Sequence, residues 1–227
     1  MEKSMEGAVD RKALHSITYG LFVLSSRSNG KDNACITNTL CQVAESPLLV
    51  SIAVNKSNYT NELIQESGIF NVSMISTSAK MDLFKRFGFV SGRDVDKFES
   101  YEKTKRSLNG VLYITESTCS FLSASVVQTV DVGSHWLYIA QVTEAKKLSD
   151  EAPCSYSYYL SDIKVRSVEA SGNVADAGVK GSESKAEKKA TWVCKICGYV
   201  YEGDPLPADF ICPICKHGAA DFERETV

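Results

Sequence analysis

The sequence contains 227 residues, with 25 Lys and Arg, 28 Asp and Glu, and a formal net charge of -3. This balance gives no general attraction for nucleic acid, and no apolar stretch approaches the ~20 residues of a membrane-spanning helix. The N-terminus lacks the apolar segment and cleavage site of a secretory signal, so we expect a cytoplasmic protein. In a reducing cytoplasm, the eight cysteines are more typical of metal ligands, reactive thiols or core residues than of disulfides.

Short stretches rich in β-branched and aromatic residues recur through the first two-thirds of the chain. The predicted strands are 17–25, 48–54, 69–75, 110–116, 121–132 and 136–142. In the last two, apolar and polar residues nearly alternate, which predicts strands with one buried and one wetter face.

Two helices are predicted between these strands. The first covers 58–64, where Asn58 or Thr60 can cap the helix, and ends near Gly68; the second covers 79–87. About six strands with two inserted helices favour a mainly β fold, an antiparallel closed or split barrel, because closure removes the edge strands.

The chain changes composition after residue 168. Residues 169–190 contain no aromatic residue, Leu or Ile, which predicts a flexible linker between a domain at 1–168 and another at 191–227. A coil of this length spans about 25 Å, so it tethers the second domain without fixing its position. A surface helix through 182–190 is the alternative.

Four cysteines are clustered in the C-terminal segment. Cys194 and Cys197 form one Cys-x-x-Cys pair, and Cys212 and Cys215 form a second pair after fourteen intervening residues. Two such pairs are typical of a tetrahedral four-thiolate metal site. The spacing alone leaves zinc and iron open.

The residues around these cysteines resemble rubredoxin over 191–225, although the intervening segment is shorter than in free-standing rubredoxins. The resemblance implies a mononuclear iron that cycles between its ferric and ferrous states. Gly198 would let backbone N–H groups approach a thiolate, which raises the reduction potential. The expected small core consists of Trp192, Tyr199, Phe210 and Phe222.

The C-terminal domain carries the whole charge imbalance. Residues 191–227 contain three basic and six acidic residues, whereas 1–168 contain eighteen of each sign. An acidic surface of this kind suggests docking to a basic patch on a redox partner, and an ordinary solvated acidic surface is the alternative.

Three segments of the first domain are similar to the flavin reductase family of FMN-binding split barrels. They are residues 33–43, 46–56 and 87–98, and the resemblance extends over about residues 10–165. It implies FMN as a cofactor. The candidate FMN-binding residues are Asn38, Thr39, Cys41, Asn55, Lys56, Asn58, Tyr59, Thr60 and Phe87.

The candidate residues have different expected roles. Asn38 and Thr39 suit the ribityl chain and phosphate, and Lys56 can neutralise phosphate charge. Tyr59 and Phe87 are expected to bracket the flavin ring. The alternative for these candidates is an ordinary structural role, such as a helix cap for Thr60 or a core position for Phe87.

A further segment, 133–138, resembles the Gly-Asp-His motif of the same family, with Ser134 in place of the Asp. By this resemblance His135 lies near the nicotinamide side of the flavin and is the candidate catalytic residue, while the Ser weakens the inference that a carboxylate orients it. A surface histidine is the alternative. The sequence contains no Gly-x-Gly-x-x-Gly fingerprint, so a Rossmann nucleotide domain is not supported.

The order of the two modules resembles the high-molecular-weight rubredoxin family, the fusions of flavin reductase and rubredoxin found in anaerobes. The resemblance implies a homodimer that passes electrons from NADH or NADPH through FMN to the iron, and then to a flavodiiron protein that reduces oxygen or nitric oxide. Two alternatives remain: a reductase that releases reduced FMN, with an accessory metal module, and a structural zinc ribbon used for protein binding. Cys35, Cys41, Cys119 and Cys154 are expected to be buried thiols, although Cys41 lies beside the predicted FMN segment.

Overall fold

The computed structural model describes residues 11–166, 190–194, 200–201, 203, 205–212 and 218–226. The chain forms two compact units, one up to residue 173 and the other from residue 174 onward, and each has its own sheet. The predicted linker lies outside the described residues except for residue 190, which begins a strand of the second unit.

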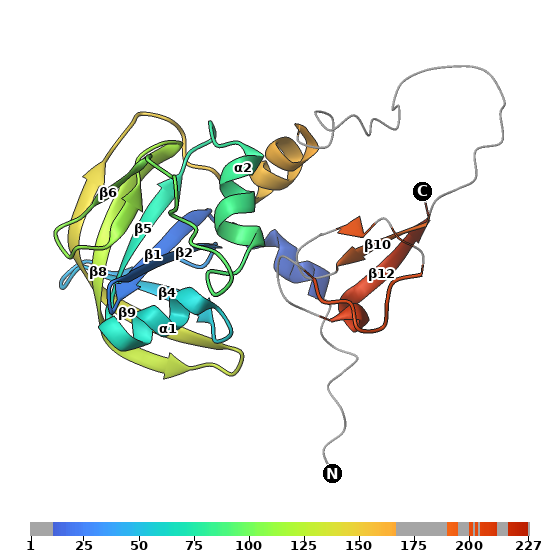
Figure 1. Ribbon diagram of the computed structural model, residues 1–227, viewed down its shortest axis with the longest axis horizontal. Helices are drawn as coiled ribbons and strands as arrows, with labels where there is room; N and C mark the ends of the chain where they lie inside the picture. The colour runs from blue at the N-terminus through green and yellow to red at the C-terminus, as the bar shows by residue number, and fades with distance from the viewer. Residues whose placement is uncertain are drawn as a thin grey trace, which may run out of the picture. The chain divides into compact units, whose positions relative to one another are not determined.

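An antiparallel sheet of seven strands forms the centre of the described part of the first unit (Figure 1). In chain order the strands are β1 (Phe22–Ser28), β2 (Lys31–Thr37), β3 (Cys41–Ala44), β4 (Leu49–Asn55), β5 (Ile69–Ile75), β8 (Thr118–Asp131) and β9 (His135–Lys147). Their order across the sheet is β2-β1-β5-β8-β9-β4-β3. A hairpin of β6 (Thr104–Arg106) and β7 (Leu112–Ile114) lies beside it and contacts β1, β5 and β8.

The sheet curls into a barrel because its two edge strands are neighbours in the sequence. β2 ends at Thr37 and β3 begins at Cys41, so the chain between them can span at most ~14 Å. Within this connection the Thr39 hydroxyl donates to the backbone oxygen of Ala53 of β4 at 2.8 Å and accepts its N–H at 3.1 Å, which continues the contact of β3 with β4 toward β2. The edge strands therefore approach each other without pairing, which is the arrangement expected for a split barrel.

Alternate residues of the strands face two separate cores. Leu24 of β1 and Cys35 of β2 belong to the barrel interior, together with Ile64 of the helix α1 (Tyr59–Ser67). Their chain neighbours Val23 and Ala34 belong to a second cluster on the outer face. Both faces of β1 and β2 are thus covered.

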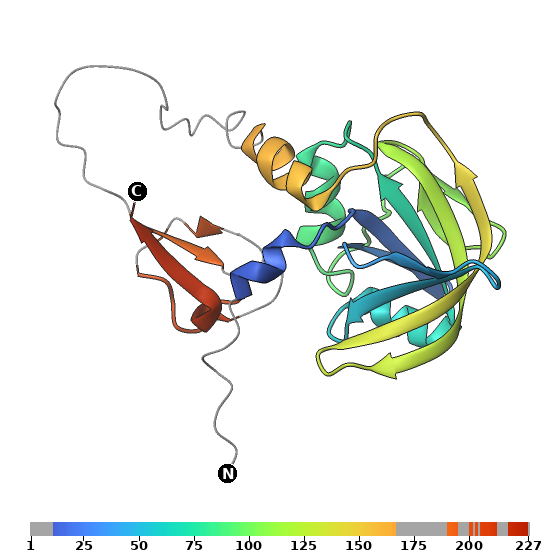
Figure 2. The same ribbon diagram turned by 180° about the vertical axis from the view of Figure 1, so that it is seen from behind.

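Short helical segments cover this outer face. They are α2 (Met81–Phe84), the π-helical turn η3 (Lys85–Phe89), α3 (Tyr156–Tyr158) and the π-helical turn η4 (Tyr159–Ile163), and a 3-10 helix, η2 (Arg11–Ser16), precedes β1. Phe84 and Tyr159 pack against each other with ring centroids 4.6 Å apart. Figure 2 shows the segment that contains η4 beside α2.

The predicted first helix and most predicted strands are confirmed, with differences at some ends. α1 starts after Asn58, whose side chain accepts the Thr60 N–H, and it ends at Gly68, where φ is +69°. The second predicted helix is shorter, because the chain changes from α2 to the π-helical turn η3. β2, β3 and β6 were not predicted.

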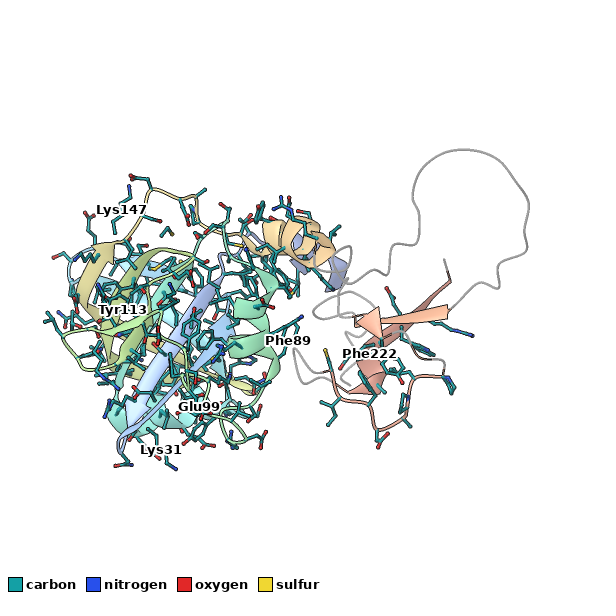
Figure 3. All side chains as sticks on the ribbon, turned by 45° about the horizontal axis from the view of Figure 1, so that its top comes forward. Lys31, Phe89, Glu99, Tyr113, Lys147 and Phe222 are labelled. Atoms are coloured by element: carbon teal, nitrogen blue, oxygen red, sulfur yellow. The ribbon has the colours of Figure 1, made fainter. Side chains whose placement is uncertain are left out.

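The second unit has a small antiparallel sheet. It consists of β10 (Ala190–Cys194), β11 (Val200–Tyr201) and β12 (Phe222–Thr226), with β10 in the centre and a 3-10 turn, η5 (Ala219–Asp221), before β12. Figure 3 labels Phe222 at the start of β12, and this side chain is buried beside Cys212. Trp192, Tyr201, Leu206 and Phe210 pack around the pair.

Among the described residues, no helix is both long and apolar enough to cross a membrane.

Candidate functional site

Two asparagines build the turn from β4 into α1, which consists of residues 56–58. The side-chain oxygen of Asn55 accepts the N–H of Ser57 at 2.9 Å and its hydroxyl at 2.8 Å. Asn58 caps the helix through its bond from the Thr60 N–H at 3.0 Å. Asx side chains satisfy backbone donors in this way at turns and helix starts. The β4–α1 turn is therefore fixed locally, and Lys56 at its start and Tyr59 just after it are both half-buried.

Lys56 is held against the hairpin between β8 and β9. Its Nζ lies 2.6 Å from Asp131 and 4.4 Å from the centre of the Trp136 ring. The hydrogen bond from Lys56, with a second from the Gly133 N–H, lowers the pKa of the Asp131 carboxyl. The predicted phosphate-binding cation thus already has a carboxylate partner.

Arg93 is a second cation at the same turn, and it was not among the predicted site residues. Its NH1 donates to the backbone oxygen of Ser57 at 3.4 Å, and its guanidinium carbon lies 5.3 Å from the centre of the Tyr59 ring. It also forms an ion pair with Glu62 in the first turn of α1. The sequence signal was present in the segment 87–98, but nothing in that segment indicates which element Arg93 reaches.

Strand pairing brings His135 next to the β4–α1 turn; this turn and the residues around it are called the β4–α1 corner below. β9 begins at His135, which lies opposite Asn55 of β4, and the Lys56 N–H donates to the backbone oxygen of Ser134 at 3.0 Å. The Nδ1 of His135 is 2.8 Å from the Ser134 hydroxyl. The residue that replaces the family's Asp therefore contacts the histidine directly, with a hydroxyl instead of a carboxylate.

The segment between β2 and β3 holds three further candidates. Asn38 and Thr39 are half-buried at the seam of the barrel, and Thr39 is bonded to Ala53 of β4. Cys41 is exposed at the start of β3. Because Ala53 is two residues from Asn55, the seam and the β4–α1 turn belong to the same end of β4.

Two predicted flavin contacts lie inside the protein instead. Thr60 is completely buried, and its hydroxyl accepts a hydrogen bond from Asn33 at 2.9 Å. Phe87 is also completely buried, against Phe98 and Tyr101, with ring centroids 5.5 and 5.3 Å away. Both side chains pack beneath the β4–α1 turn.

The polar residues under the corner form a connected network. The Lys97 side chain is buried and donates to the backbone oxygens of Ala34 at 2.8 Å and Phe87 at 3.0 Å. Burial raises the pKa of the Cys35 thiol, and contacts with Thr60, Lys97 and Asn58 oppose that increase. β2, α1 and the loop after η3 are thus tied together below the surface.

The corner as a whole suits a ligand with an aromatic body and an anionic group. Lys56 lies on the turn, and Arg93 reaches the turn from the loop after η3, where its guanidinium contacts Ser57 and the half-buried Tyr59 ring. Amide and hydroxyl groups of Asn38 and Thr39 are at the adjacent seam. Guanidinium and ammonium groups bind phosphate or carboxylate, and an aromatic ring stacks on a planar ligand.

The predicted metal ligands are only partly within the described residues. Cys197 and Cys215 lie outside them, as do Gly198 and Tyr199. Cys194 ends β10, where its pairing partner is Phe222, and Phe222 packs against the buried Cys212. One cysteine from each Cys-x-x-Cys pair is therefore placed next to the same aromatic residue. The predicted core positions Trp192, Phe210 and Phe222 are confirmed.

The other four cysteines separate into two groups. Cys35, Cys119 and Cys154 are buried, as expected, and burial raises the pKa of Cys154 to about 11. Cys41 is exposed, so the expectation of a buried thiol is wrong at this position.

Comparison with known proteins gives a match for each unit. Residues 14–164 match the flavin reductase-like domain, and residues 192–223 match the rubredoxin-like domain of rubrerythrin. A protein from Moorella thermoacetica named high molecular weight rubredoxin is 34% identical over 95% of this chain and 100% of its own length. A ferric-chelate reductase (NAD(P)H) from Archaeoglobus fulgidus is 33% identical over 66% of this chain and 89% of its own length.

A solved structure shows the same fold for the first unit. It is an NADH:FAD oxidoreductase from Streptomyces globisporus, which covers 68% of this chain and 91% of its own chain with a TM-score of 0.59 and 17% identity. The predicted mainly β barrel with inserted helices, followed by a small rubredoxin-like domain, is confirmed.

Proposed function

We propose that this chain, which belongs to the flavin reductase-like family and carries a C-terminal rubredoxin-like domain, is an NAD(P)H-dependent oxidoreductase that delivers single electrons to an external protein acceptor. The fusion of the two domains carries the proposal, because the high molecular weight rubredoxin aligns with this chain along its whole length. A four-thiolate iron centre exchanges one electron at a time. Its attachment to a reductase domain favours a relay between a two-electron donor and a one-electron acceptor.

FMN is the cofactor that the β4–α1 corner fits by the chemistry of its donors. Bound there, FMN would supply the exchange between two-electron and one-electron chemistry. Asn38 and Thr39 would bind the ribityl chain, Lys56 and the capped start of α1 the phosphate, and Tyr59 one face of the ring. Thr60 and Phe87 would support this surface from within, because both side chains are completely buried.

His135 is the residue that we assign to the donor side. Its ring is oriented by the Ser134 hydroxyl, and its backbone is fixed by pairing with Asn55. From this position it would hydrogen-bond the nicotinamide donor. No protein nucleophile is required, because hydride transfer needs the two ring systems to be held in contact.

We assign iron to the C-terminal site, held by Cys194, Cys197, Cys212 and Cys215. Cys212 is buried among aromatic side chains, and this surrounding shields a thiolate centre from water. Thiolate ligands alone also suit zinc, so metal analysis is part of the test.

The acceptor and the assembly follow from the same proposal. We propose a flavodiiron protein that reduces oxygen or nitric oxide as the acceptor, and a homodimer as the assembly. The linker 169–190 would allow each rubredoxin-like domain to reach a barrel and the external acceptor in turn.

A visible spectrum of the purified chain tests the proposal. We expect flavin absorption together with red ferric-thiolate bands, one FMN and one iron per chain, and bleaching of both on anaerobic addition of NADH or NADPH. A chain that contains zinc, or that shows flavin absorption alone, would instead support the structural zinc ribbon.

Cysteine variants separate transfer through iron from release of reduced flavin. Cys212→Ser should retain NAD(P)H-dependent flavin reduction and lose nearly all transfer to cytochrome c under anaerobic conditions. Cys119→Ser is the matched control, because Cys119 is a buried thiol of the first unit that donates to the Met74 oxygen, and serine keeps a donor there. Undiminished transfer in Cys212→Ser would favour a reductase that releases reduced FMN.

A further inference from the structure

We propose that Asp131 is a positioning residue for His135, because it fixes the β8–β9 turn, residues 132–134, and fastens this turn to the β4–α1 turn. The inference rests on the proposed function and makes its donor side more specific. It assigns part of the binding of NAD(P)H to a carboxylate that was not among the predicted site residues.

The β8–β9 turn is a surface segment with little packing to hold it. Residues 131–134 are all exposed, Val132 with 51% of its surface. His135 follows the turn at the start of β9 and is half-buried. An exposed turn takes its position from hydrogen bonds rather than from apolar contacts. The direction of His135 therefore depends on the bonds that hold this turn.

Asp131 fixes the turn from within. Its Oδ1 accepts the Gly133 N–H at 2.9 Å, and the Val132 N–H donates to the backbone oxygen of His135 at 3.2 Å. An Asp side chain that accepts the N–H two residues later forms an Asx turn. Gly133 has a φ of +87°, a value that favours glycine. These contacts define the path of the chain from Asp131 to His135.

The same carboxylate fastens the turn to the β4–α1 turn through Lys56. The Lys56 Nζ lies 2.6 Å from Asp131 Oδ1, and the Lys56 backbone N–H donates to the Ser134 oxygen at 3.0 Å. Lys56 therefore holds the turn near both of its ends, with its side chain at one end and its backbone at the other. The Trp136 ring lies 4.4 Å from Nζ and limits where the ammonium group can move. One carboxylate oxygen thus joins the internal bond of the turn to its external anchor.

These contacts give the turn a defined position more than they stabilise the fold. The Lys56 and Asp131 side chains are 34% and 55% exposed, and exposed ion pairs add little to the free energy of unfolding. The position of a group that contacts a ligand has larger effects, because a displacement of about 1 Å can lower a rate on the order of a hundredfold. We therefore expect the loss of Asp131 to change donor binding far more than stability.

The experiment uses the full-length chain. Asp131→Ala removes both bonds, whereas Asp131→Asn keeps an acceptor for the Gly133 N–H and loses the charge. Asp150→Asn is the matched control, because Asp150 is an exposed carboxylate that pairs with Lys147 at the other end of β9. Flavin-stripped protein is titrated with FMN, and reconstituted protein is assayed with NADH and NADPH.

The two ligands should respond differently. We expect Asp131→Ala to raise the KM of the donor at least about fivefold, and Asp131→Asn to raise it less. The dissociation constant of FMN should not increase, because Lys56 keeps its charge. Asp150→Asn should leave both values unchanged. An unchanged donor KM in Asp131→Ala overturns the proposal, and so does an equal weakening of FMN and donor, which would indicate a general structural role.

A double-mutant cycle shows whether Asp131 acts through His135. If it does, His135→Gln also raises the donor KM, and the addition of Asp131→Ala to this variant causes no further increase. Increases that multiply in the double variant would mean that the two residues act independently, and they would overturn the proposal.

Hydrogen exchange gives a readout that needs neither cofactor nor turnover. In the flavin-stripped chain, the amides of Gly133 and Lys56 should exchange at least about fivefold faster in Asp131→Ala than in the parent, because the bonds that protect them are lost or loosened. The amide of the buried Tyr138, in the middle of β9, should exchange at the parent rate. Unchanged exchange at both Gly133 and Lys56 would contradict the anchoring of the turn.

The proposed function fails in a different way. A parent chain that neither binds FMN nor oxidises NAD(P)H contradicts the reductase assignment itself. A parent chain that does both, with a donor KM that is sensitive to His135 and insensitive to Asp131, contradicts only the role of Asp131.

Discussion

Single side chains at the β4–α1 corner show that the sequence predicts contacts between near neighbours in the chain better than contacts between distant residues. Asn58 caps α1 through a contact two residues away, so the sequence predicts it from spacing alone. Arg93 contacts Tyr59 and Glu62 across more than thirty residues, and such a contact depends on how the loop folds back. The sequence therefore predicts the helix start and misses its partner. Thr60 and Phe87 show the converse, because their residue types suit a ligand and burial assigns them to packing.

Replacement of Asn58 tests the cap. Asn58→Ala removes the acceptor of the Thr60 N–H and should lower the free energy of unfolding by ~1 kcal/mol. Denaturant unfolding of the full chain measures the change. Gln65→Ala, at an exposed position of the same helix, should stay within ~0.5 kcal/mol of the parent. Equal stability of Asn58→Ala and the parent would contradict the role of the cap.

Cysteine reactivity gives a second test at the scale of residues. Burial raises the pKa of Cys154 to about 11, so at pH 8 almost all of this thiol is protonated and unreactive. Cys41 is exposed on β3. Brief alkylation at pH 8, followed by mass spectrometry, should label Cys41 in the native chain and Cys154 only after unfolding.

The pH dependence has a definite sign. Labelling of Cys154 should increase as the pH rises from 9 toward 11, because the thiolate fraction increases toward the raised pKa. Labelling of native Cys154 at pH 8 as fast as that of Cys41 would show that the site opens to solvent.

At the scale of elements, the hydrophobic pattern of the sequence predicts strands whose side chains pack in the cores. It misses strands whose polar side chains are bonded to other elements. β5 is predicted with its observed bounds, and its residues face the two cores. β2 contains the polar residues Asp32 and Asn33, and no strand is predicted at this position. The structure pairs Asp32 with Arg106 and Asn33 with Thr60, so these polar residues are satisfied by elements far away in the sequence.

β8 shows why simple alternation fails. Phe121 and Leu122 are neighbours in the chain and both are buried. Leu122 faces the barrel interior, whereas Phe121 stacks on Tyr113 of the β6–β7 hairpin with ring centroids 3.7 Å apart. Tyr113 is labelled in Figure 3. Because the hairpin covers the outer face, the strand loses its period of two there.

The contact between Asp32 and Arg106 should hold this hairpin on the barrel. The carboxylate accepts two bonds from Arg106, at 3.0 and 2.9 Å, and its side chain is only 13% exposed. Asp32→Asn should lower the free energy of unfolding by ~1–2 kcal/mol, measured by denaturant unfolding. The same change at Glu116, whose pair with Lys103 is longer and exposed, should cost less than ~0.5 kcal/mol. Equal effects at the two positions would show that the Asp32 pair behaves as an ordinary surface pair.

At the scale of the whole molecule, the division into a neutral reductase domain and an acidic rubredoxin-like domain is visible in the sequence. The cysteine spacing and the composition of 169–190 are local features that do not depend on the fold. The corner of the first domain is different, because it is assembled from β2, β4, β9, α1 and the loop after η3. Its residue types could be inferred by resemblance, but their burial and pairing required the three-dimensional structure.

The acidic surface makes a prediction about the external acceptor. Asp209 is exposed in the second unit, two residues before the exposed Ile211 and three before the buried Cys212. With cytochrome c as a basic one-electron acceptor, Asp209→Asn should lower kcat/KM about twofold to threefold at 20 mM salt. The reason is that removing a negative charge weakens electrostatic steering toward a basic partner. The effect should disappear at 500 mM salt, where exposed charges are screened within a few ångströms.

The control separates local docking from net charge. Glu102→Gln makes the same change in net charge at an exposed position of the first unit, and it should leave kcat/KM unaffected. An equal decrease in both variants would mean that the total charge of the chain steers the acceptor. No decrease in Asp209→Asn at low salt would mean that electrons leave the protein away from the acidic residues of the second unit. A decrease confined to Asp209→Asn at low salt would place the exit of electrons on the surface of the rubredoxin-like domain.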